Sequence, residues 1–261
     1  DPLVAPLPFG DPASVDVSGL VVGYFIDDGL VAPSQAVGRA VLESVKALRE
    51  RGVEARPFAP PRMTEAASLY FALMSGDGGE TAWEKIEGGP VEKTLLPLRR
   101  IAEMPGSLRG AAARAMKLVG EANGGLLLDA LGEKTVHAFW RLTREARAYR
   151  LEVLDCMKHA GVAALLCPAH ATPAVPHGKS AQFLLAGARS MLFNLLQFPA
   201  GVVPVTQVRP GETERGGHGA DRFEKTAAAV DRESVGLPGG VQVAARPFRD
   251  EDALALMLAL E

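Results

Sequence analysis

The chain has 261 residues, of which 48% are hydrophobic and 23% are charged, and its formal net charge is −3. This composition is typical of a folded globular protein and excludes a disordered chain. The near balance of charge gives no reason to expect a nucleic-acid partner. Since no stretch approaches the ~18–20 continuous apolar residues of a membrane-spanning helix and no signal peptide is visible, we expect a cytoplasmic protein.

The two cysteines and five histidines lack the spacing of a metal site. Cys156 lies in a helical pattern and Cys167 in an apolar run, which favours buried thiols in a reducing compartment. The histidines are scattered along the chain, at His137, His159, His170, His177 and His218. The scatter of the histidines argues against a zinc site.

The first 58 residues predict a linker followed by a βαβ unit. Residues 1–19 are rich in proline and polar side chains and are interpreted as an N-terminal linker. An apolar run at 19–25 predicts a buried strand. Next comes an amphipathic helix with Ser34 as its N-cap and Gly52 at its end, and then a second strand at 53–58. A strand, a helix and a strand in this order indicate a parallel sheet.

Residues 60–132 are helical in pattern but repeatedly interrupted by glycine and proline, so we interpret them as a helical cap or insertion. Residues 134–160 predict a long helix, because apolar side chains recur at steps of three and four until Gly161. Residues 162–168 predict a buried strand.

The remainder predicts further elements of a mixed or parallel sheet flanked by helices, and hence an α/β fold. A helix is expected over 181–196, a strand after Phe198, a polar glycine-rich insertion, a last strand within 234–246 and a final helix over 250–260. Pro199 and Gly201 suggest a tight turn between the helix and its strand. Pro204 requires an irregular or unpaired position in that strand, which otherwise has the pattern of a buried one.

Catalytic sequence patterns are mostly absent. The chain contains no nucleophile elbow, P-loop or dinucleotide-binding glycine motif. His177, Lys179 and Ser180 stand close together in "HGKS", but neighbours in sequence are seldom a catalytic unit, so Ser180 is interpreted as a helix cap. His170 and His177 are interpreted as loop residues, with a substrate contact as the alternative.

Residues 95–120 predict two short helices with apolar and basic faces. In the second helix Leu108, Met116 and Val119 belong to the apolar side, whereas Arg109 and Lys117 lie on the other. Such a pair can lie on an anionic membrane surface as a peripheral contact. The alternative is that both helices pack on the body of the protein or on a second subunit.

Several segments together resemble the C-terminal half of amidase-signature enzymes, and more specifically the fatty-acid amide hydrolase branch. They are "FWRLTREARAYRLEVLDCMKHAGVAALLCPAHATPA", "MLFNLLQFPAGVVPVTQV", "SVGLPGGVQVAARPFRDEDALALM", "SGDGGETAWEKIEGG" and the region from "LPFGDP" to "VEARPFAPP". The resemblance spans nearly the whole chain, with its anchors in the family order. It implies an amidase fold, a small-molecule amide substrate and no cofactor.

The family mechanism implied by this resemblance uses two serines and a lysine. One serine attacks the amide carbonyl, the lysine moves the proton through the second serine, and backbone amides stabilise the oxyanion. This chain contains no adjacent pair of serines and no glycine- and serine-rich signature. It also begins at Asp1 rather than at methionine. We therefore expect a fragment that lacks its catalytic residues, is inactive alone, and needs the N-terminal half of the enzyme as its partner.

The resemblance nominates residues for an acyl-binding pocket. On the helix leading into "FPAGVVPV", Met191 takes the deepest pocket position. Gly187 and Leu184 stand one and two turns before it on the same face. For all three the alternative is ordinary core packing.

Four more pocket residues come from other segments. Counting back from the long helix places Leu127 and Leu131 at channel-lining positions near the cap. Phe223 in "DRFEK" matches an aromatic residue at the channel border, and Met74 is a weaker candidate beside "SGDGG". Core packing is again the alternative.

Two other functions stay open. The chain could be a self-standing domain that binds acyl ligands or a partner, or a non-catalytic module paired with a separate chain that carries the triad. A half-sheet would leave an unpaired edge and an uncovered apolar face, so we also expect either self-association, such as a homodimer, or marginal stability.

Overall fold

A five-stranded mixed sheet forms the centre of the protein. The computed structural model describes residues 8–90, 95–177, 180–217 and 221–261. The strand order is β2-β1-β3-β5-β4. β1 pairs in parallel with β2 and β3, whereas β5 runs antiparallel to both β3 and β4. The strand bounds are β1 Val21–Tyr24, β2 Glu54–Pro57, β3 Ala164–Pro168, β4 Ala200–Gln207 and β5 Pro238–Ala245. This arrangement confirms the predicted α/β fold with a mixed sheet.

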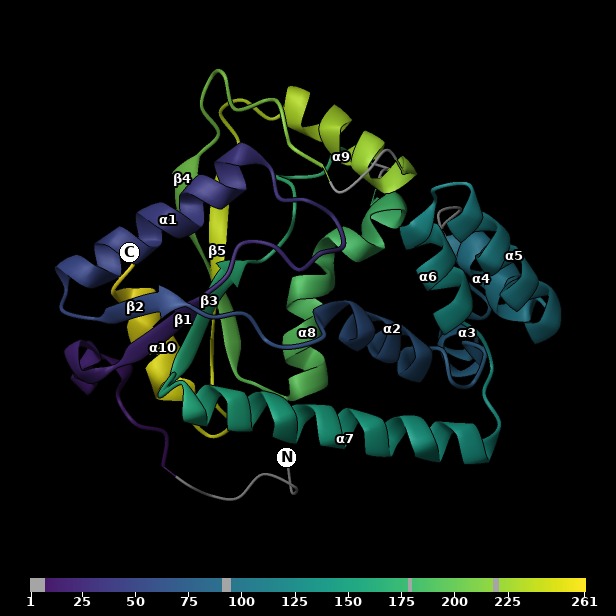
Figure 1. The fold of residues 1–261 in the computed structure, drawn as a ribbon, viewed down its shortest axis with the longest axis horizontal. Coiled ribbons are helices and arrows are strands. Elements are labelled where there is room, and N and C mark those ends of the chain that lie inside the picture. Colours follow the sequence, from purple (N-terminus) through teal and green to yellow (C-terminus); the bar gives the residue numbers. More distant parts are fainter. Residues whose placement is uncertain (1–7, 91–94, 178–179, 218–220) are drawn as a thin grey trace.

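Helices surround the sheet and extend well beyond one of its ends (Figure 1). The α-helices are α1 Gln35–Glu50, α2 Met63–Met74, α3 Glu80–Ile86, α4 Leu96–Glu103, α5 Gly106–Leu118, α6 Ala122–Ala130, α7 Val136–His159, α8 Ala188–Leu196, α9 Arg222–Arg232 and α10 Asp250–Leu258. The 3₁₀ helices are η1 Pro12–Ser14, η2 Val17–Gly19 and η4 Ser180–Gly187. The predicted N-cap is present, because Ser34 Oγ accepts a hydrogen bond from Val37 N at 3.2 Å. Gly52 and Gly161 follow α1 and α7 with φ of 85° and 63°, as a helix end favours.

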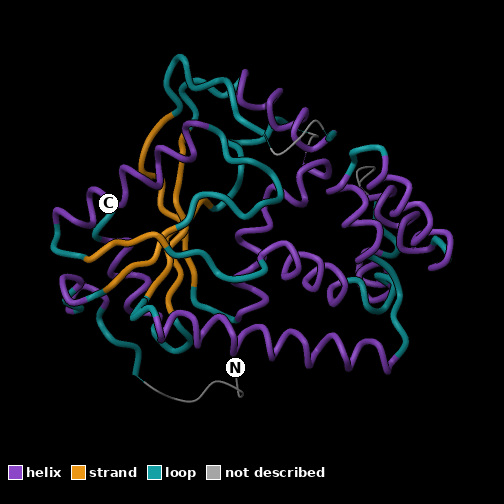
Figure 2. The backbone as a smooth tube through the Cα atoms, viewed as in Figure 1, coloured by secondary structure: helices purple, strands orange, loops and turns teal. Residues whose placement is uncertain are grey.

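The sheet is covered on both faces. One core cluster joins buried side chains of α1 and α10, such as Val41 and Leu256, to strand residues such as Leu166. Another joins α7 and α8, through Met157 and Phe193 among others, to residues of the opposite face. Figure 2 shows the strands enclosed between these helices. The predicted long helix is therefore α7, and it packs on the sheet.

The region interpreted as a cap consists of short helices in the described residues, as predicted. α3, α4, α5 and α6 lie away from the sheet, whereas α2 packs against α7 and α8 (Figure 1). α5 and α6 approach closely at Gly125, where a Cβ would lie 2.8 Å from Ala113 O. The N-terminal segment is also packed, since η1 contacts α10 and Gly10 N donates to Glu251 Oε1 at 2.9 Å. Whether cap and linker are separate units stays a prediction.

The strand after Phe198 differs from the buried strand that its sequence suggests. β4 is at an edge of the sheet, and Val202 in its middle is 50% exposed. Its pairing with β5 shifts register between Pro204 and Thr206, which confirms the irregular position required by Pro204. The preceding turn is made by Gln197, which has φ of 56°. Gly201 lies within the strand instead, where a side chain would collide with Met257.

The predicted helix over 181–196 is only half α-helical. Residues 180–187 form the 3₁₀ helix η4, and α8 begins at Ala188. One reason is that the carbonyl of Ala186 accepts a hydrogen bond from Ala171 N at 2.9 Å, outside the helix. A second difference is α9, which occupies the end of what appeared to be only a polar insertion.

The basic face predicted for residues 95–120 is also partly wrong. Arg109 is buried, and its Nη1 donates to Met104 O at 2.8 Å, because α5 turns this side toward the protein. The apolar residues Leu108, Leu118 and Val119 are exposed instead, by 57%, 87% and 76%. One side of α5 therefore packs on α6 while part of its apolar surface remains uncovered.

Candidate functional site

A third apolar cluster lies beyond the sheet, and we call it the distal cluster. It joins α2, α6, η4, α8, α9 and the loop between β1 and α1. Its buried members are Leu30, Val31, Ala67, Phe71, Leu127, Ala130, Ala171, Leu185, Ala186, Ala188, Phe223, Ala227 and Val230. The partly buried Tyr70, Leu126, Leu131, Val175, Leu184 and Met191 pack against it. Segments far apart in the sequence thus build one apolar wall.

The structure brings six of the seven pocket candidates together at this cluster. Leu127 and Phe223 are buried members of it, whereas Leu131, Leu184 and Met191 pack against it. Gly187 is their neighbour, because a Cβ at Gly187 would lie 3.9 Å from Met191 Cε. Met74 is the exception: it is 65% exposed and lines a different cavity between α2, α7 and α8.

The position of Met191 follows from the two-sided character of α8. Leu192, Phe193 and Leu196 are buried against the sheet and α7. Met191 projects from another side of the same helix and reaches the distal cluster. The sheet-facing residues therefore fix the helix, and this leaves Met191 partly accessible on the wall.

His170 lies at one end of the wall. Its Cδ2 would be 3.5 Å from a Cβ at Gly187. Burial lowers the pKa of His170 to about 4, although a hydrogen bond with Thr172 opposes the shift, so the ring is neutral near pH 7. The ring lines a cavity of about 300 Å³ together with Val175, which also packs against the distal cluster. The wall and this cavity therefore adjoin at Val175.

A buried ion pair links two of the segments that form the wall, α8 and the loop between β1 and α1. Arg189 Nη2 lies 3.1 Å from Asp28 Oδ1, and the two side chains are 0% and 3% exposed. Burial raises the pKa of Asp28, and the charge of Arg189 opposes that rise. Arg189 Nε and Nη1 and Asp28 Oδ2 have no hydrogen-bond partner among the described residues. The pair therefore holds two charges in a largely apolar setting.

A second buried pair stands close to the first. Arg215 contacts Asp231 through both carboxylate oxygens, with Nε–Oδ2 at 2.5 Å and Nη2–Oδ1 at 2.8 Å. The side chains are 3% and 0% exposed. Such a bidentate contact is the strong form of an arginine–carboxylate pair. The polar insertion therefore contributes to the interior, which its composition did not predict.

Four buried or mostly buried side chains hold the backbone of the loop between β1 and α1, whose Leu30 and Val31 belong to the distal cluster. The hydrogen bonds are Asn123 Nδ2 to Leu30 O at 2.9 Å, Arg189 Nη2 to Val31 O at 3.0 Å, Arg215 Nη1 to Ala32 O at 2.6 Å and Ala32 N to Glu224 Oε1 at 2.8 Å. Sequence reasoning missed this polar support. A single arginine within the apolar run around 184–196 was its one visible sign.

The described residues near the wall include no activated nucleophile. Ser190 Oγ donates to Ala169 O at 2.7 Å and lies 3.2 Å from Gln242 Oε1, so its hydroxyl has structural partners. Cys167 is buried as predicted, whereas Cys156 is only partly buried. Burial raises the pKa of the Cys167 thiol, which disfavours the reactive thiolate. Lys179 lies outside the described residues.

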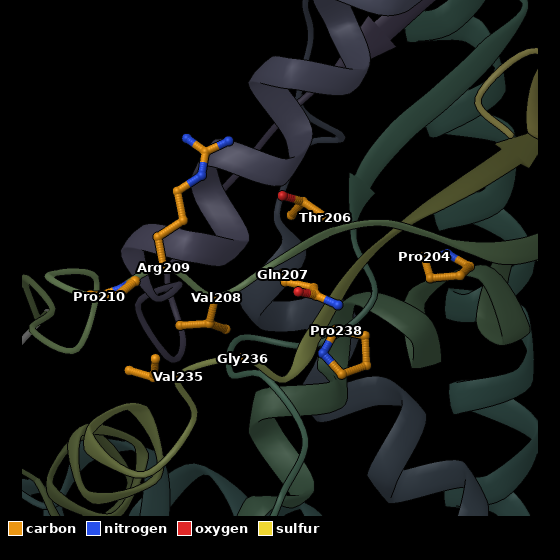
Figure 3. A pocket seen from close by; sticks show the side chains of 9 residues that line it. All are labelled: Pro204, Thr206, Gln207, Val208, Arg209, Pro210, Val235, Gly236 and Pro238. Carbon is orange, nitrogen blue, oxygen red and sulfur yellow. The ribbon is translucent and has the colours of Figure 1, made fainter.

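The groove drawn in Figure 3 lies where β4 ends and β5 begins, and it shares Pro238 with the cavity beside His170. It is lined by residues such as Pro204, Val235 and Pro238, and its volume is about 640 Å³. Among its described lining residues Arg209 is the one charged side chain; it extends away from Val235 and Pro238 in this view and pairs with Glu43 at 2.8 Å. A groove without a second titratable group has little capacity for acid–base chemistry. The wall with its adjoining cavity is therefore the better candidate site.

The described part of the chain shows no group of three or more His, Cys, Asp or Glu side chains able to hold a metal ion. Within the same residues, no helix is both long and apolar enough to span a bilayer.

Comparison with known proteins identifies the family. A family model described as "Amidase" matches residues 4–254, which is nearly the whole chain. The chain belongs to the amidase family. Among curated proteins, "Fatty acid amide hydrolase 1" of Caenorhabditis elegans is 33% identical to this amidase chain over 268 residues, covering 100% of this chain and 46% of that protein. "Fatty-acid amide hydrolase 1" of Sus scrofa is 31% identical over 266 residues, with the same two coverages of 100% and 46%.

Solved structures show the same fold in relatives of lower identity. A fatty acid amide hydrolase superposes with a TM-score of 0.72 at 20% identity, covering 99% of this chain and 42% of that one. A 6-aminohexanoate cyclic dimer hydrolase complexed with substrate gives a TM-score of 0.56 at 17% identity, with coverages of 98% and 48%. The amidase chain thus spans less than half the length of these curated relatives and solved structures.

Proposed function

We propose that this chain provides the acyl-binding wall of an enzyme that hydrolyses fatty-acyl amides, with the serine and lysine residues of catalysis contributed by sequence outside these 261 residues. One observation carries the proposal: six residues nominated for an acyl pocket, from three separate segments, gather at the distal cluster. The family match and the two fatty-acid amide hydrolase relatives support the reaction class.

The wall would act through apolar contact. Each methylene of an acyl chain that leaves water for an apolar surface contributes roughly 0.8 kcal/mol. Met191 and Leu184, partly buried at the cluster, are the side chains best placed to gain further burial from a ligand. Binding energy from such a remote chain can position the amide carbonyl for attack. The wall would therefore set the preference for acyl length while the chemistry takes place elsewhere.

The first experiment reduces the volume available to an acyl chain at position 191. In the protein that joins this chain to the catalytic residues, Met191→Trp should lower kcat/KM for long acyl amides by about 10-fold and change it little for short ones. Leu42→Trp is the matched control, because Leu42 is 51% exposed on α1, on the other side of the sheet. An equal loss of kcat/KM for long and short substrates would show that Met191 only packs in the core and does not contact the acyl chain.

The second experiment locates the nucleophile. A fluorophosphonate probe should leave the 261-residue chain unlabelled and should label the protein that also carries the serine pair and lysine. Labelling of any serine within these 261 residues would contradict the proposal that the nucleophile lies outside them.

The alternative function is a non-catalytic domain that binds acyl ligands, either alone or beside a separate chain with the triad. Ser190, whose hydroxyl donates to Ala169 O, is consistent with such a domain, and equally with catalytic residues that lie outside this chain. Coding sequence distinguishes the two: an in-frame serine pair and lysine upstream support the enzyme, whereas a start codon immediately before Asp1 supports the binding domain.

Two contacts with partners belong to the same proposal. The exposed Leu108 and Leu118 of α5, with Val119 directly after it, would touch a membrane surface. The exposed Val136 and Trp140 on α7, at 75% and 63%, would meet a second copy of the chain.

A further inference from the structure

A separate cavity of about 340 Å³ lies where α2, α7 and α8 pack against one another (Figure 1). α2 contributes Tyr70, Leu73 and Met74 to its lining, and α8 contributes Leu195. The volume is within the ~300–1,000 Å³ of small-molecule sites. Tyr70 also packs against the distal cluster, so the cavity adjoins the acyl wall without being part of it.

The charge of this cavity has one sign. Arg147 and Arg150 of α7 line it, and none of its lining residues in the described chain carries a carboxylate. These two positions are three apart and therefore lie on one face of the helix. Arg150 Nη1 donates to Gln197 Oε1, which steadies it at the rim. Arg147 makes no ion pair or hydrogen bond with another described residue.

The contrast with the neighbouring arginines is informative. Elsewhere on α7, Arg141 pairs with Glu145 at 3.6 Å. At the start of α2, Arg62 pairs with Glu65 at 2.8 Å. Carboxylates therefore neutralise the charges of Arg141 and Arg62. Arg147 and Arg150 have no such partner in the described part of the chain, and their positive charges face a cavity whose other side is apolar. An anionic head with a single apolar chain is the ligand chemistry that fits both features.

We infer that this cavity binds a free fatty acid, with its carboxylate at Arg147 and Arg150 and its chain over Tyr70, Leu73 and Met74. The guanidinium fork matches a carboxylate in shape and charge. The choice of a fatty acid over other single-chain anions rests on the proposed function, because hydrolysis of a fatty-acyl amide releases this carboxylate. The binding site itself rests on the cavity and its charge.

Isothermal titration of the chain with dodecanoate, below its micelle-forming concentration, tests the inference. Arg147→Gln/Arg150→Gln should weaken binding about 10-fold or more, since two charge-assisted contacts are lost. Met74→Asp should weaken it similarly, and its 65% exposure means that the fold does not depend on this side chain. Arg144→Gln is the matched control, because Arg144 is an exposed arginine of the same helix outside the cavity.

A series of ligands tests the contributions of the carboxylate and of the alkyl chain to affinity separately. Methyl dodecanoate, which has no charge, and butyrate, which has almost no tail, should each bind about 10-fold or more weakly than dodecanoate. Equal affinity for the ester and the acid would overturn the inference. So would a double arginine variant that binds as the wild type does. Weakening by Met191→Trp but not by the arginine variant would place the ligand on the acyl wall, which contradicts this inference and supports the proposed function.

Discussion

Arg189 and Asp28 form an ion pair of 3.1 Å that is almost fully withdrawn from solvent, with side chains 0% and 3% exposed. Arg189 lies on the helix that also carries Met191, and Asp28 lies on the loop that brings Leu30 and Val31 to the distal cluster. One polar contact thus joins two sides of the apolar wall. A buried pair of this kind is costly to break, because the remaining charge has no compensation.

Arg189→Met should lower the free energy of unfolding by about 3 kcal/mol, since it leaves Asp28 buried without its cation. The pKa of Asp28 should then rise further above its ordinary value, because the opposing charge is gone while burial remains. Urea denaturation near pH 7 measures the loss.

The double variant Arg189→Met/Asp28→Asn provides the control for that prediction. It removes both charges and should be more stable than Arg189→Met alone. If the single variant were as stable as the wild type, the ion pair would have no role in holding α8 to the loop.

His170 predicts an acid-sensitive component of stability. The folded protein keeps its pKa near 4, whereas an unfolded chain takes up the proton near pH 6.5, so the unfolded state binds more protons between these values. Stability should therefore fall as the pH drops from about 6.5 to 4, by up to about 3 kcal/mol from this group. His170→Gln should reduce that fall in urea denaturation at pH 7, 5.5 and 4.

His159→Gln is the comparison for the histidine experiment, because His159 lies exposed at the end of α7. It should preserve the wild-type pH dependence. Identical profiles for His170→Gln and the wild type would show that His170 is not kept neutral by the fold.

The exposed apolar residues of α5 predict membrane contact. Leu118→Glu/Val119→Glu should reduce co-sedimentation with vesicles containing anionic lipid, because two side chains that are 87% and 76% exposed would no longer enter the headgroup region. Leu258→Glu, on the exposed side of α10, is a control that should not change binding. Co-sedimentation unaffected by the α5 change would exclude this surface.

The exposed apolar side of α7 predicts self-association. Trp140→Glu should shift the chain toward a monomer in light scattering coupled to size-exclusion chromatography, since it places a charge where an apolar side chain would be buried. Its circular dichroism should not change, because Trp140 is 63% exposed. A wild-type chain that is monomeric at high protein concentration would contradict the proposed homodimer.

The sequence by itself determined the features that depend on neighbours along the chain. Ser34 could be assigned as an N-cap because its hydroxyl bonds only three residues ahead, and Gly52 and Gly161 because a helix end favours a positive φ. Pro204 required an irregular strand position because proline has no N–H to donate. The segment resemblance added the family and the pocket candidates.

Only the tertiary structure decided what depends on contacts between distant residues. Nothing local indicates that Arg215 would be buried against Asp231, or that Arg189 would meet Asp28, because each partner is brought in by a different segment. The same holds for Met74, which lies outside the distal cluster, and for Val202, whose exposure follows from the edge position of β4. Apolar periodicity tells which side of an element is buried, whereas strand order and helix packing decide which surfaces meet and which stay open to a ligand.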